Sequence, residues 1–141
     1  MAKKVFVSFD YEHDKHYKFL LEAWSKNDKF DFEFYDHSSG EINTNDISRV
    51  KAALTAKIRS ADITFVIIGK YANSWHEDYE KIGYKNWINF EIAKSVEAGN
   101  SLVAIKLDRE FVSPDEILNK NASWAYSFTE DSIVAALEKA Q

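Results

Sequence analysis

The chain of 141 residues contains no cysteine. This absence excludes disulfide bonds, thiolate zinc sites and a cysteine nucleophile, and it is consistent with a reducing compartment. Long hydrophobic runs are also missing, because the apolar segment near the start has only about six residues, too few for a signal peptide or a membrane span. We therefore expect a cytoplasmic protein that does not associate with membranes.

Positive charge is not in excess either. The sequence has 18 Lys and Arg residues against 23 Asp and Glu residues, a formal net charge of -5. Proteins that hold nucleic acid or anionic lipid through charge carry clustered basic residues, so we expect neither partner. The length and the 45% hydrophobic content suit one full core. We predict a single domain over residues 1–141.

Glycine is scarce, with four residues, and none lies in the turn that follows the first predicted strand. A dinucleotide-binding Rossmann unit needs a glycine-rich turn there, and a flavodoxin needs a phosphate loop that the acidic residues 10–14 would repel. A phosphorelay receiver would need an aspartate after the third strand, where Gly69 stands. The Walker signature is absent, and the four histidines lack zinc-ligand spacing. We expect no metal and no bound cofactor.

The pattern of apolar residues alternates between strand and helix five times. Strands are predicted at residues 4–9, 30–34, 63–68, 102–105 and 124–128, and helices at 15–24, from a cap at Asn43 or Thr44 to about 60, at 87–98, and after Thr129. This alternation predicts an α/β fold, a three-layer flavodoxin-like sandwich. Its five-stranded parallel sheet would have the order 2-1-3-4-5, with the second strand at an edge and helices on both faces.

That order places a ligand crevice beyond the carboxyl ends of the first and third strands. Ser8, Phe9 and Asp10 end the first strand, and the helix that carries Trp87 and Glu91 starts from the same side of the sheet. Residues four apart share a helix face. We therefore predict that Trp87 and Glu91 face the crevice, opposite Phe9 and Asp10. The irregular segment 70–85 is a long connection of the kind that often has a function.

An aromatic ring beside a carboxylate suits cleavage of a glycosidic bond, because the carboxylate stabilises the oxocarbenium-like transition state. Nicotinamide needs no general acid to leave NAD, since its departure cancels the pyridinium charge. Glu91 could hold the ribose hydroxyls while Trp87 or Phe9 stacks on the substrate. The same residues would also suit an ordinary amphipathic helix.

Residues 4–10, 63–69 and 87–100 together resemble the TIR-like domain of the bacterial Thoeris anti-phage protein ThsB, over roughly residues 3–107. TIR domains open with a strand of the type Phe-Ile-Ser-Tyr, similar to residues 6–9 here, and enzymatic members carry a Trp-x-x-x-Glu helix, matched by Trp87 and Glu91. The resemblance implies a TIR-like fold and a catalytic role for Glu91. It also implies that NAD is the substrate and that the product, a cyclic or otherwise modified ADP-ribose, activates a separate effector protein upon infection.

Two segments depart from the wider family. Residues 36–40 lack the Arg-Asp-x-x-Pro-Gly pattern of receptor and adaptor TIR domains, and the acidic turn at residues 10–12 leaves the phosphate contacts unassigned. We take Ser8, Phe9, Asp10 and Trp87 as candidate NAD-binding residues. The alternatives are a non-catalytic assembly module, which has no need of Glu91, and a nucleotide sensor. We further expect a homo-oligomer on activation, and a product that is cyclic, linear or conjugated.

Overall fold

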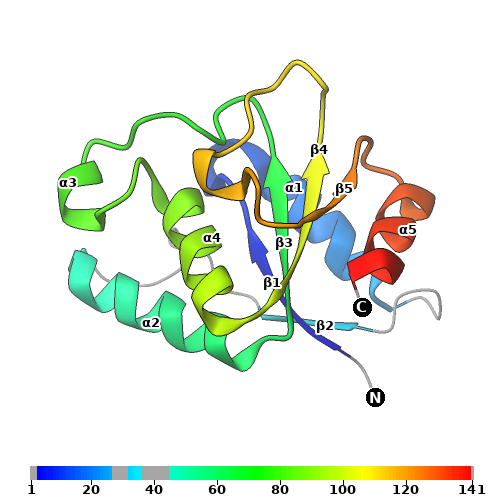
Figure 1. Cartoon of the computed structure of the whole chain (residues 1–141), viewed down its shortest axis with the longest axis horizontal. Coiled ribbons are helices and arrows are strands. Elements are labelled where there is room, and N and C mark those ends of the chain that lie inside the picture. Colours follow the sequence, from blue (N-terminus) through cyan, green and yellow to red (C-terminus); the bar gives the residue numbers. More distant parts are fainter. Residues whose placement is uncertain (1–2, 27–31, 36–44, 141) are drawn as a thin grey trace.

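The computed structural model of the chain describes residues 3–26, 32–35 and 45–140. Its centre is a parallel sheet of five strands in the order β2-β1-β3-β4-β5 (Figure 1). The strands are β1 (Lys3–Ser8), β2 (Phe32–Tyr35), β3 (Ile63–Ile68), β4 (Ser101–Lys106) and β5 (Ser123–Ala125). The predicted strand order is confirmed, and β2 lies at an edge as expected.

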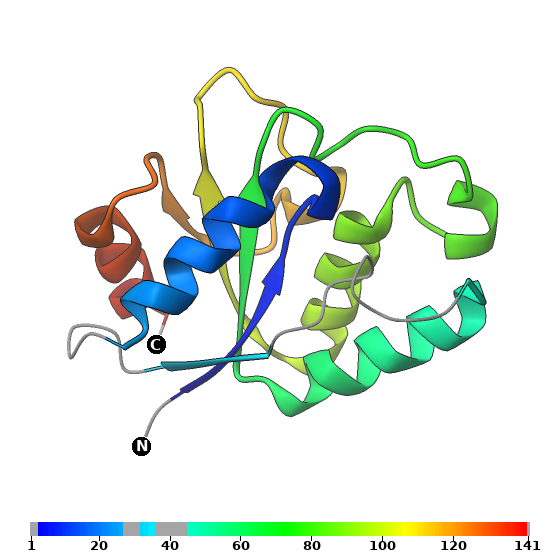
Figure 2. The ribbon, with the colours of Figure 1, turned by 180° about the vertical axis from the view of Figure 1, so that it is seen from behind.

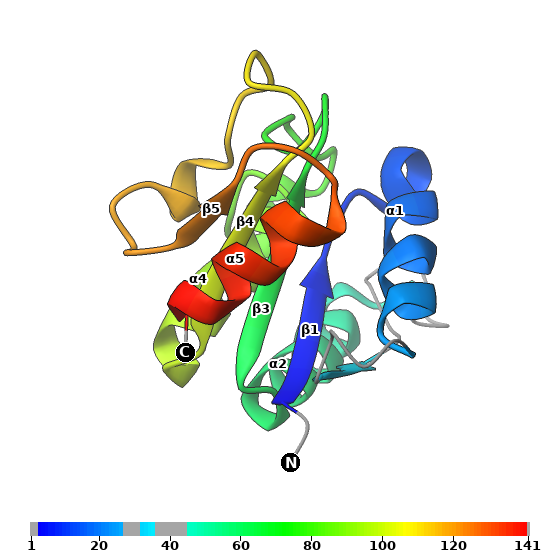
Figure 3. The ribbon, with the colours of Figure 1, turned by 90° about the vertical axis from the view of Figure 1, so that its right-hand side faces the viewer.

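Helices cover both faces of this sheet. They are α1 (Tyr11–Trp24), α2 (Ile47–Ser60), α3 (Tyr79–Ile82), α4 (Trp87–Ala98) and α5 (Glu130–Ala140), with a short 3-10 helix, η1 (Asp115–Ile117). Helices α2 and α4 lie in front of the sheet in Figure 1, whereas α1 lies in front of it when the molecule is seen from behind (Figure 2). Helix α5 packs into the same core as α1, beside β5. The side view shows the resulting layers (Figure 3). None of the helices within the described residues is long and apolar enough to cross a membrane.

The central strand β3 is buried along its whole length, as its continuous apolar sequence predicts. Ile63, Phe65 and Ile67 pack in the core beneath α1 and α5. Val66 and Ile68 point to the opposite face, where they pack with residues of α4. Successive side chains of a strand alternate between faces, so one strand supplies both cores.

Helix α1 begins four residues earlier than the sequence pattern indicates. Residues 10–14, predicted as an exit loop, contain the N-cap Asp10 and the first turn of the helix. The Asp10 carboxylate accepts a hydrogen bond from the Glu12 backbone N–H at 3.1 Å. The acidic residues Glu12 and Asp14 suit this position, because the N-terminus of a helix carries partial positive charge.

Helix α2 ends at Ser60, as predicted, but its cap is Asp46. The Asp46 carboxylate accepts hydrogen bonds from the backbone N–H groups of Ser48 and Arg49 at 2.9 and 3.3 Å. The predicted caps, Asn43 and Thr44, and the segment 36–40 lie outside the described residues.

Helix α4 has the predicted bounds. Asn86 is its N-cap, and Gly99 ends it with a φ of 79°, a left-handed conformation that glycine adopts without strain. The helix starts at the carboxyl edge of the sheet and runs back across the face of β1 and β3 (Figure 1). Residues in its first turn therefore lie near that edge, and residues in later turns lie over the sheet.

Candidate functional site

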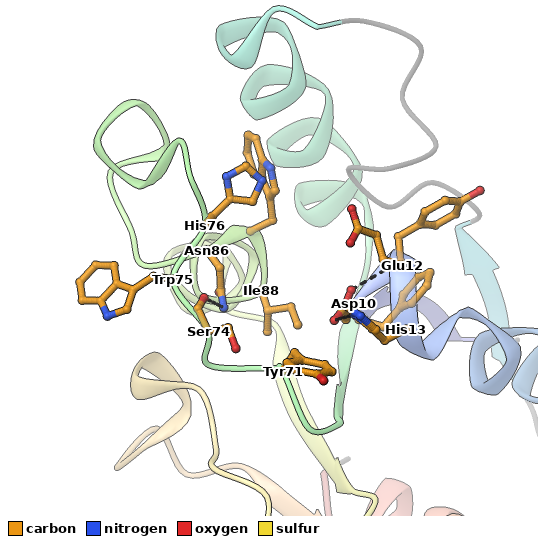
Figure 4. Close-up of a pocket in the computed structure, with 12 residues that line it drawn as sticks. Asp10, Glu12, His13, Tyr71, Ser74, Trp75, His76, Asn86 and Ile88 are labelled. Atoms are coloured by element: carbon orange, nitrogen blue, oxygen red, sulfur yellow. Dashed lines mark hydrogen bonds and ion pairs between the residues drawn. The ribbon is translucent and has the colours of Figure 1, made fainter.

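A cavity of about 650 Å³ lies at the carboxyl edge of the sheet (Figure 4). Three segments form it: the connection from β1 into α1, the loop after β3 and the first turn of α4. The described lining residues are Phe9, Asp10, Tyr11, Glu12, His13, Tyr71, Ser74, Trp75, His76, Asn86, Trp87 and Ile88. The structure thus brings together Phe9, Asp10 and Trp87, three of the predicted site residues, whose binding roles stay predictions.

The other two predicted residues, Ser8 and Glu91, are buried and do not line the cavity. The exposed fractions of Ser8 and Glu91 are 0% and 1%. Ser8 Oγ donates a hydrogen bond of 2.6 Å to Glu91 Oε1. The prediction that Glu91 faces the crevice is therefore wrong for this structure. The physical reason is that one helical turn advances about 5.4 Å along the axis, which carries Glu91 from the edge, where Trp87 lies, to a position over β1.

Burial changes the acidity of Glu91. It raises the pKa of the carboxyl to about 8, and the hydrogen bond from Ser8 opposes this effect only in part. The second oxygen, Oε2, has no hydrogen-bond partner among the described residues. In this state the carboxyl is mostly protonated at neutral pH. A buried acid with a strongly raised pKa, close to a cavity, is the kind of group that functional sites often contain.

Asp10 lines the cavity and is also the N-cap residue of α1. Its carboxylate caps the helix through Glu12, and Asp10 Oδ2 lies 2.7 Å from Nδ1 of His13. This hydrogen bond is the largest of the effects that raise the pKa of His13, and burial opposes it. The His13 ring packs against Tyr71, with ring centroids 4.4 Å apart. The contact between His13 and Tyr71 therefore links the start of α1 to the loop after β3.

The loop after β3 supplies the opposite side of the cavity. Trp75 is 66% exposed and meets Tyr79 edge to face, with ring centroids 5.0 Å apart. The His76 ring lies 6.4 Å from that of Trp87, and its Nδ1 accepts a hydrogen bond of 2.9 Å from the Asp78 backbone N–H. Because Nδ1 accepts this bond, Nε2 is the ring nitrogen that bears a proton and can donate it to a ligand.

Three asparagines hold this loop against the start of α4. The side-chain nitrogen of Asn86 donates to the backbone carbonyls of Ala72 and Ser74, both at 2.9 Å. The side-chain nitrogen of Asn89 donates to the side-chain oxygens of Asn73 and Asn86 at 3.1 and 2.9 Å. The 1% exposed Asn89 also accepts a bond of 2.9 Å from the backbone N–H of a residue in η1. These bonds fix the position of the cavity wall.

Replacing Asn89 with alanine is expected to lower the free energy of unfolding by about 2 kcal/mol, because it leaves buried polar groups without partners. Chemical denaturation measures this change. Glu97→Ala is the control, since Glu97 is exposed and forms a surface ion pair with Lys94, a contact that contributes little to stability. Equal losses in the two variants would mean that the asparagine cluster does not stabilise the fold.

Several residues of the site have no recognisable signal in the sequence. His13, Tyr71 and His76 line the cavity, but nothing in their local pattern marks them. Asn86 could have been identified from the sequence as the N-cap of α4, because asparagine directly before a helix is a favoured N-cap residue. Among residues 3–26, 32–35 and 45–140, no group of three or more acidic or histidine side chains is placed to hold a metal ion.

Solved structures with a similar fold were found, whereas no curated protein matches the chain. One is a 2-deoxyribosyltransferase from the bacterium Bacillus psychrosaccharolyticus, with a TM-score of 0.58 and 17% identity over 92% of this chain and 90% of that one. Another is a de novo designed Rossmann 2x3 fold protein, with a TM-score of 0.49 and 16% identity over 99% and 88% of the two chains. At such identities the first likeness shows the fold alone.

The family comparison is more specific. The model of the Thoeris protein ThsB, TIR-like domain, matches residues 6–110. This range includes the end of β1 and the whole of β3, α4 and β4, together with every described residue that lines the cavity. The match covers most of the 141 residues and includes the Trp87 and Glu91 pair. The chain therefore belongs to the family of the TIR-like domain of Thoeris protein ThsB.

Proposed function

We propose that this chain is an anti-phage defence enzyme that cleaves the nicotinamide-ribose bond of NAD. Membership of the ThsB family supports a defence-related TIR-like function, and some members of that family cleave NAD. In our proposal the protein acts in the cytoplasm, uses NAD as its substrate without a metal or a further cofactor, and assembles with other copies on activation. The ADP-ribose product, cyclic in our proposal, carries the signal to a separate effector protein.

The observation that carries the proposal is the position of Glu91. Its carboxyl lies one helical turn from Trp87, which lines the cavity, and it bonds to Ser8 at the end of β1. The cavity volume of about 650 Å³ is within the usual range of small-molecule sites. A carboxyl directly behind an aromatic-walled cavity suits the stabilisation of positive charge on a sugar.

The reaction breaks the bond between C1′ of the ribose and the pyridinium nitrogen. The bonding electron pair moves to that nitrogen, so nicotinamide leaves as a neutral molecule and the ribose takes on oxocarbenium character. The Glu91 carboxylate stabilises this positive charge. A hydroxyl or nitrogen elsewhere on the same ADP-ribose then bonds to C1′, closes a ring and releases a proton to solvent, whereas attack by water would give linear ADP-ribose and a proton.

This mechanism requires two changes at Glu91. The carboxyl must lose its proton, and it must move from its contact with Ser8 toward the cavity. Both changes are easier once the site opens, because contact with solvent or with a cationic substrate favours the charged form of an acid. The need for such a change fits a requirement for a trigger or for assembly.

The experiment is the incubation of NAD with wild type and with Glu91→Gln, each at high concentration, with and without extract from phage-infected cells. Chromatography and mass spectrometry identify nicotinamide and the nucleotide product. We expect nicotinamide release from wild type and a rate at least about a hundredfold lower from Glu91→Gln, because an interaction made in the transition state is lost.

Glu97→Gln is the matched control, since it makes the same chemical change on the exposed side of the same helix, and it should keep the wild-type rate. Equal release by wild type and Glu91→Gln would remove Glu91 from its role. No release by wild type, even with infected-cell extract, would contradict NAD cleavage itself.

The burial of Glu91 favours a second candidate function, a nucleotide sensor that binds ADP-ribose without chemistry. Such a protein would need the cavity but not an ionised carboxyl. Calorimetric binding of ADP-ribose with equal affinity by wild type and Glu91→Gln, together with no turnover of NAD, would support this second function and exclude the first.

A further inference from the structure

One wall of the cavity is held from outside by a segment that does not line it. Ser74, Trp75 and His76 form this wall, which we call the wall segment (Figure 4). The backbone N–H of His76 donates a hydrogen bond of 2.9 Å to the backbone carbonyl of Lys85, just before α4. The 3-10 helix η1 comes from the connection between β4 and β5 and packs against α4 (Figure 1). It therefore lies where it can support both the wall segment and the start of α4.

Asn73 and Asp115 join η1 to the loop after β3 through two reciprocal hydrogen bonds. The side-chain nitrogen of Asn73 donates to Oδ1 of Asp115 at 3.0 Å. In return, the backbone N–H of Asp115 donates to the side-chain oxygen of Asn73 at 3.1 Å. Because Asn73 directly precedes the wall segment, this pair fixes one end of the wall.

The second oxygen of the same carboxylate reaches the other end of the wall. Oδ2 of Asp115 lies 3.3 Å from Nζ of Lys85. Lys85 Nζ is also 4.9 Å from the ring centroid of Trp75, which has the geometry of a cation–π interaction. Lys85 thus contacts the wall segment twice, through its backbone carbonyl and through its side chain, and Asp115 holds that side chain in place.

The Asp115 side chain is 62% exposed. Ion pairs and hydrogen bonds at such a surface position contribute little to the stability of the whole fold, so the effect of this carboxylate is local. Asp115 also lies beyond residue 110, where the match to the family model ends. The support of the wall by η1 is therefore a feature of this chain that the family match does not include.

We propose that Asp115 is a positioning residue of the cavity, whose carboxylate holds Trp75 and His76 ready for a ligand that it does not itself touch. The inference rests on the proposed function, since the ligand is taken to be a nucleotide. A wall that is held before binding costs less conformational entropy when the ligand arrives. Loss of the carboxylate should therefore raise the KM for NAD and leave kcat unchanged, because the wall segment does not include Glu91.

Hydrogen exchange of the His76 backbone amide tests the positioning without any ligand. This amide exchanges only when its bond to the Lys85 carbonyl opens, so its rate reports how firmly the wall is held. In Asp115→Ala we expect exchange about fivefold faster, because two partly exposed contacts are lost. The amides of β3 should keep their rates. The backbone N–H groups of Asp115 and Glu116 still donate to Asn73 and Asn89, so η1 stays attached in the variant.

Calorimetric titration with ADP-ribose measures the effect on binding. We expect an affinity about fivefold lower in Asp115→Ala, as the ordering of one or two side chains costs. Asp115→Asn keeps an oxygen that accepts the bond from Asn73 and loses only the charge opposite Lys85, so it should lower the affinity about twofold.

Glu110→Ala is the matched control, because it removes an exposed carboxylate from the same connection between β4 and β5. The bond of Glu110 to Asp108 is made by its backbone N–H and survives the replacement. This variant should keep the wild-type exchange rate at His76 and the wild-type affinity for ADP-ribose.

Three results would overturn the inference: equal exchange rates of the His76 amide in wild type and Asp115→Ala, equal affinities of the two proteins for ADP-ribose, or no binding by wild type at millimolar concentration. Neither measurement depends on turnover. If wild type does not cleave NAD but both effects of Asp115→Ala appear, the positioning role stands and the proposed chemistry fails. If wild type cleaves NAD and Asp115→Ala has the same KM, the chemistry stands and this inference fails.

Discussion

Replacing Glu91 with glutamine is expected to raise the free energy of unfolding at pH 7 by up to about 3 kcal/mol, even as it removes the proposed activity. The pKa of Glu91 is about 8 in the folded protein, against a model value of 4.5. At pH 7 the Glu91 carboxyl is ionised in the unfolded chain but protonated in the folded chain. The pH then lies about 2.5 units above the pKa of the unfolded chain, and each unit costs the folded state about 1.4 kcal/mol. Glutamine is never ionised and avoids this cost.

The geometry allows this exchange. Glutamine keeps a side-chain oxygen that can accept the hydrogen bond from Ser8 Oγ. Its amide nitrogen takes the place of Oε2, which already has no partner among the described residues, so the unpaired polar atom of the variant lies where wild type already has one. Because Glu91 is 1% exposed, solvent does not screen the effect in this state.

The dependence on pH has a definite sign. A folded-state pKa that is raised means that the folded protein binds the proton more tightly, so this contribution is present in full below about pH 4.5 and is lost as the pH rises to about 8. Urea denaturation of both proteins across this range should give curves that diverge as the pH increases. Asp14, whose pKa burial also raises, is common to both proteins and cancels in the difference. Parallel curves would contradict the raised pKa of Glu91.

The strand order could be predicted because it depends on local patterns. Each strand and helix has its own periodicity, and a parallel sheet built from such units has few allowed topologies. The convergence of Phe9, Asp10 and Trp87 follows from that order alone, since carboxyl ends of neighbouring strands share an edge. These residues needed no knowledge of side-chain contacts.

The depth of Glu91 could not be predicted in the same way. Its spacing from Trp87 determines the face of the helix, but not how far along the sheet that turn of the helix lies. The partner Ser8 is 83 positions away in the sequence, and only the packing of α4 on β1 brings the two side chains together. The contacts of Asn89 with Asn73 and with the backbone of Glu116 are equally remote from any local signal.

The early start of α1 is a different case, because its signal was present in the sequence. Asp10 is a favoured N-cap residue, and acidic residues in the next turn interact well with the helix dipole. The run of polar residues at positions 10–14 predicts a loop only when apolar periodicity is considered alone. The capping pattern was the better guide, since the first turn of this helix lies partly exposed beside the cavity.

A second large effect is expected from Gly69→Ala, which should lower the free energy of unfolding by about 2 to 3 kcal/mol. Gly69 follows β3, and the side chain of Asp14 from α1 packs directly on it. A Cβ placed on Gly69 would lie 2.7 Å from Cγ and 2.8 Å from Oδ1 of Asp14, and would overlap with Oδ2. Asp14 is 7% exposed, so its side chain cannot simply swing out into water. Close approach, rather than backbone conformation, explains the glycine here.

Asp14→Ala provides the test of that cause. The Asp14 carboxyl has a pKa raised first by burial and then by the charge of Asp10, and its Oδ2 has no partner among the described residues. Its removal should therefore be close to neutral or slightly stabilising. Denaturation of the two single variants and of the double variant forms a cycle in which Gly69→Ala should lose most of its effect once Asp14 is alanine. The same loss in both backgrounds would show that the carboxyl is not what excludes a side chain at position 69.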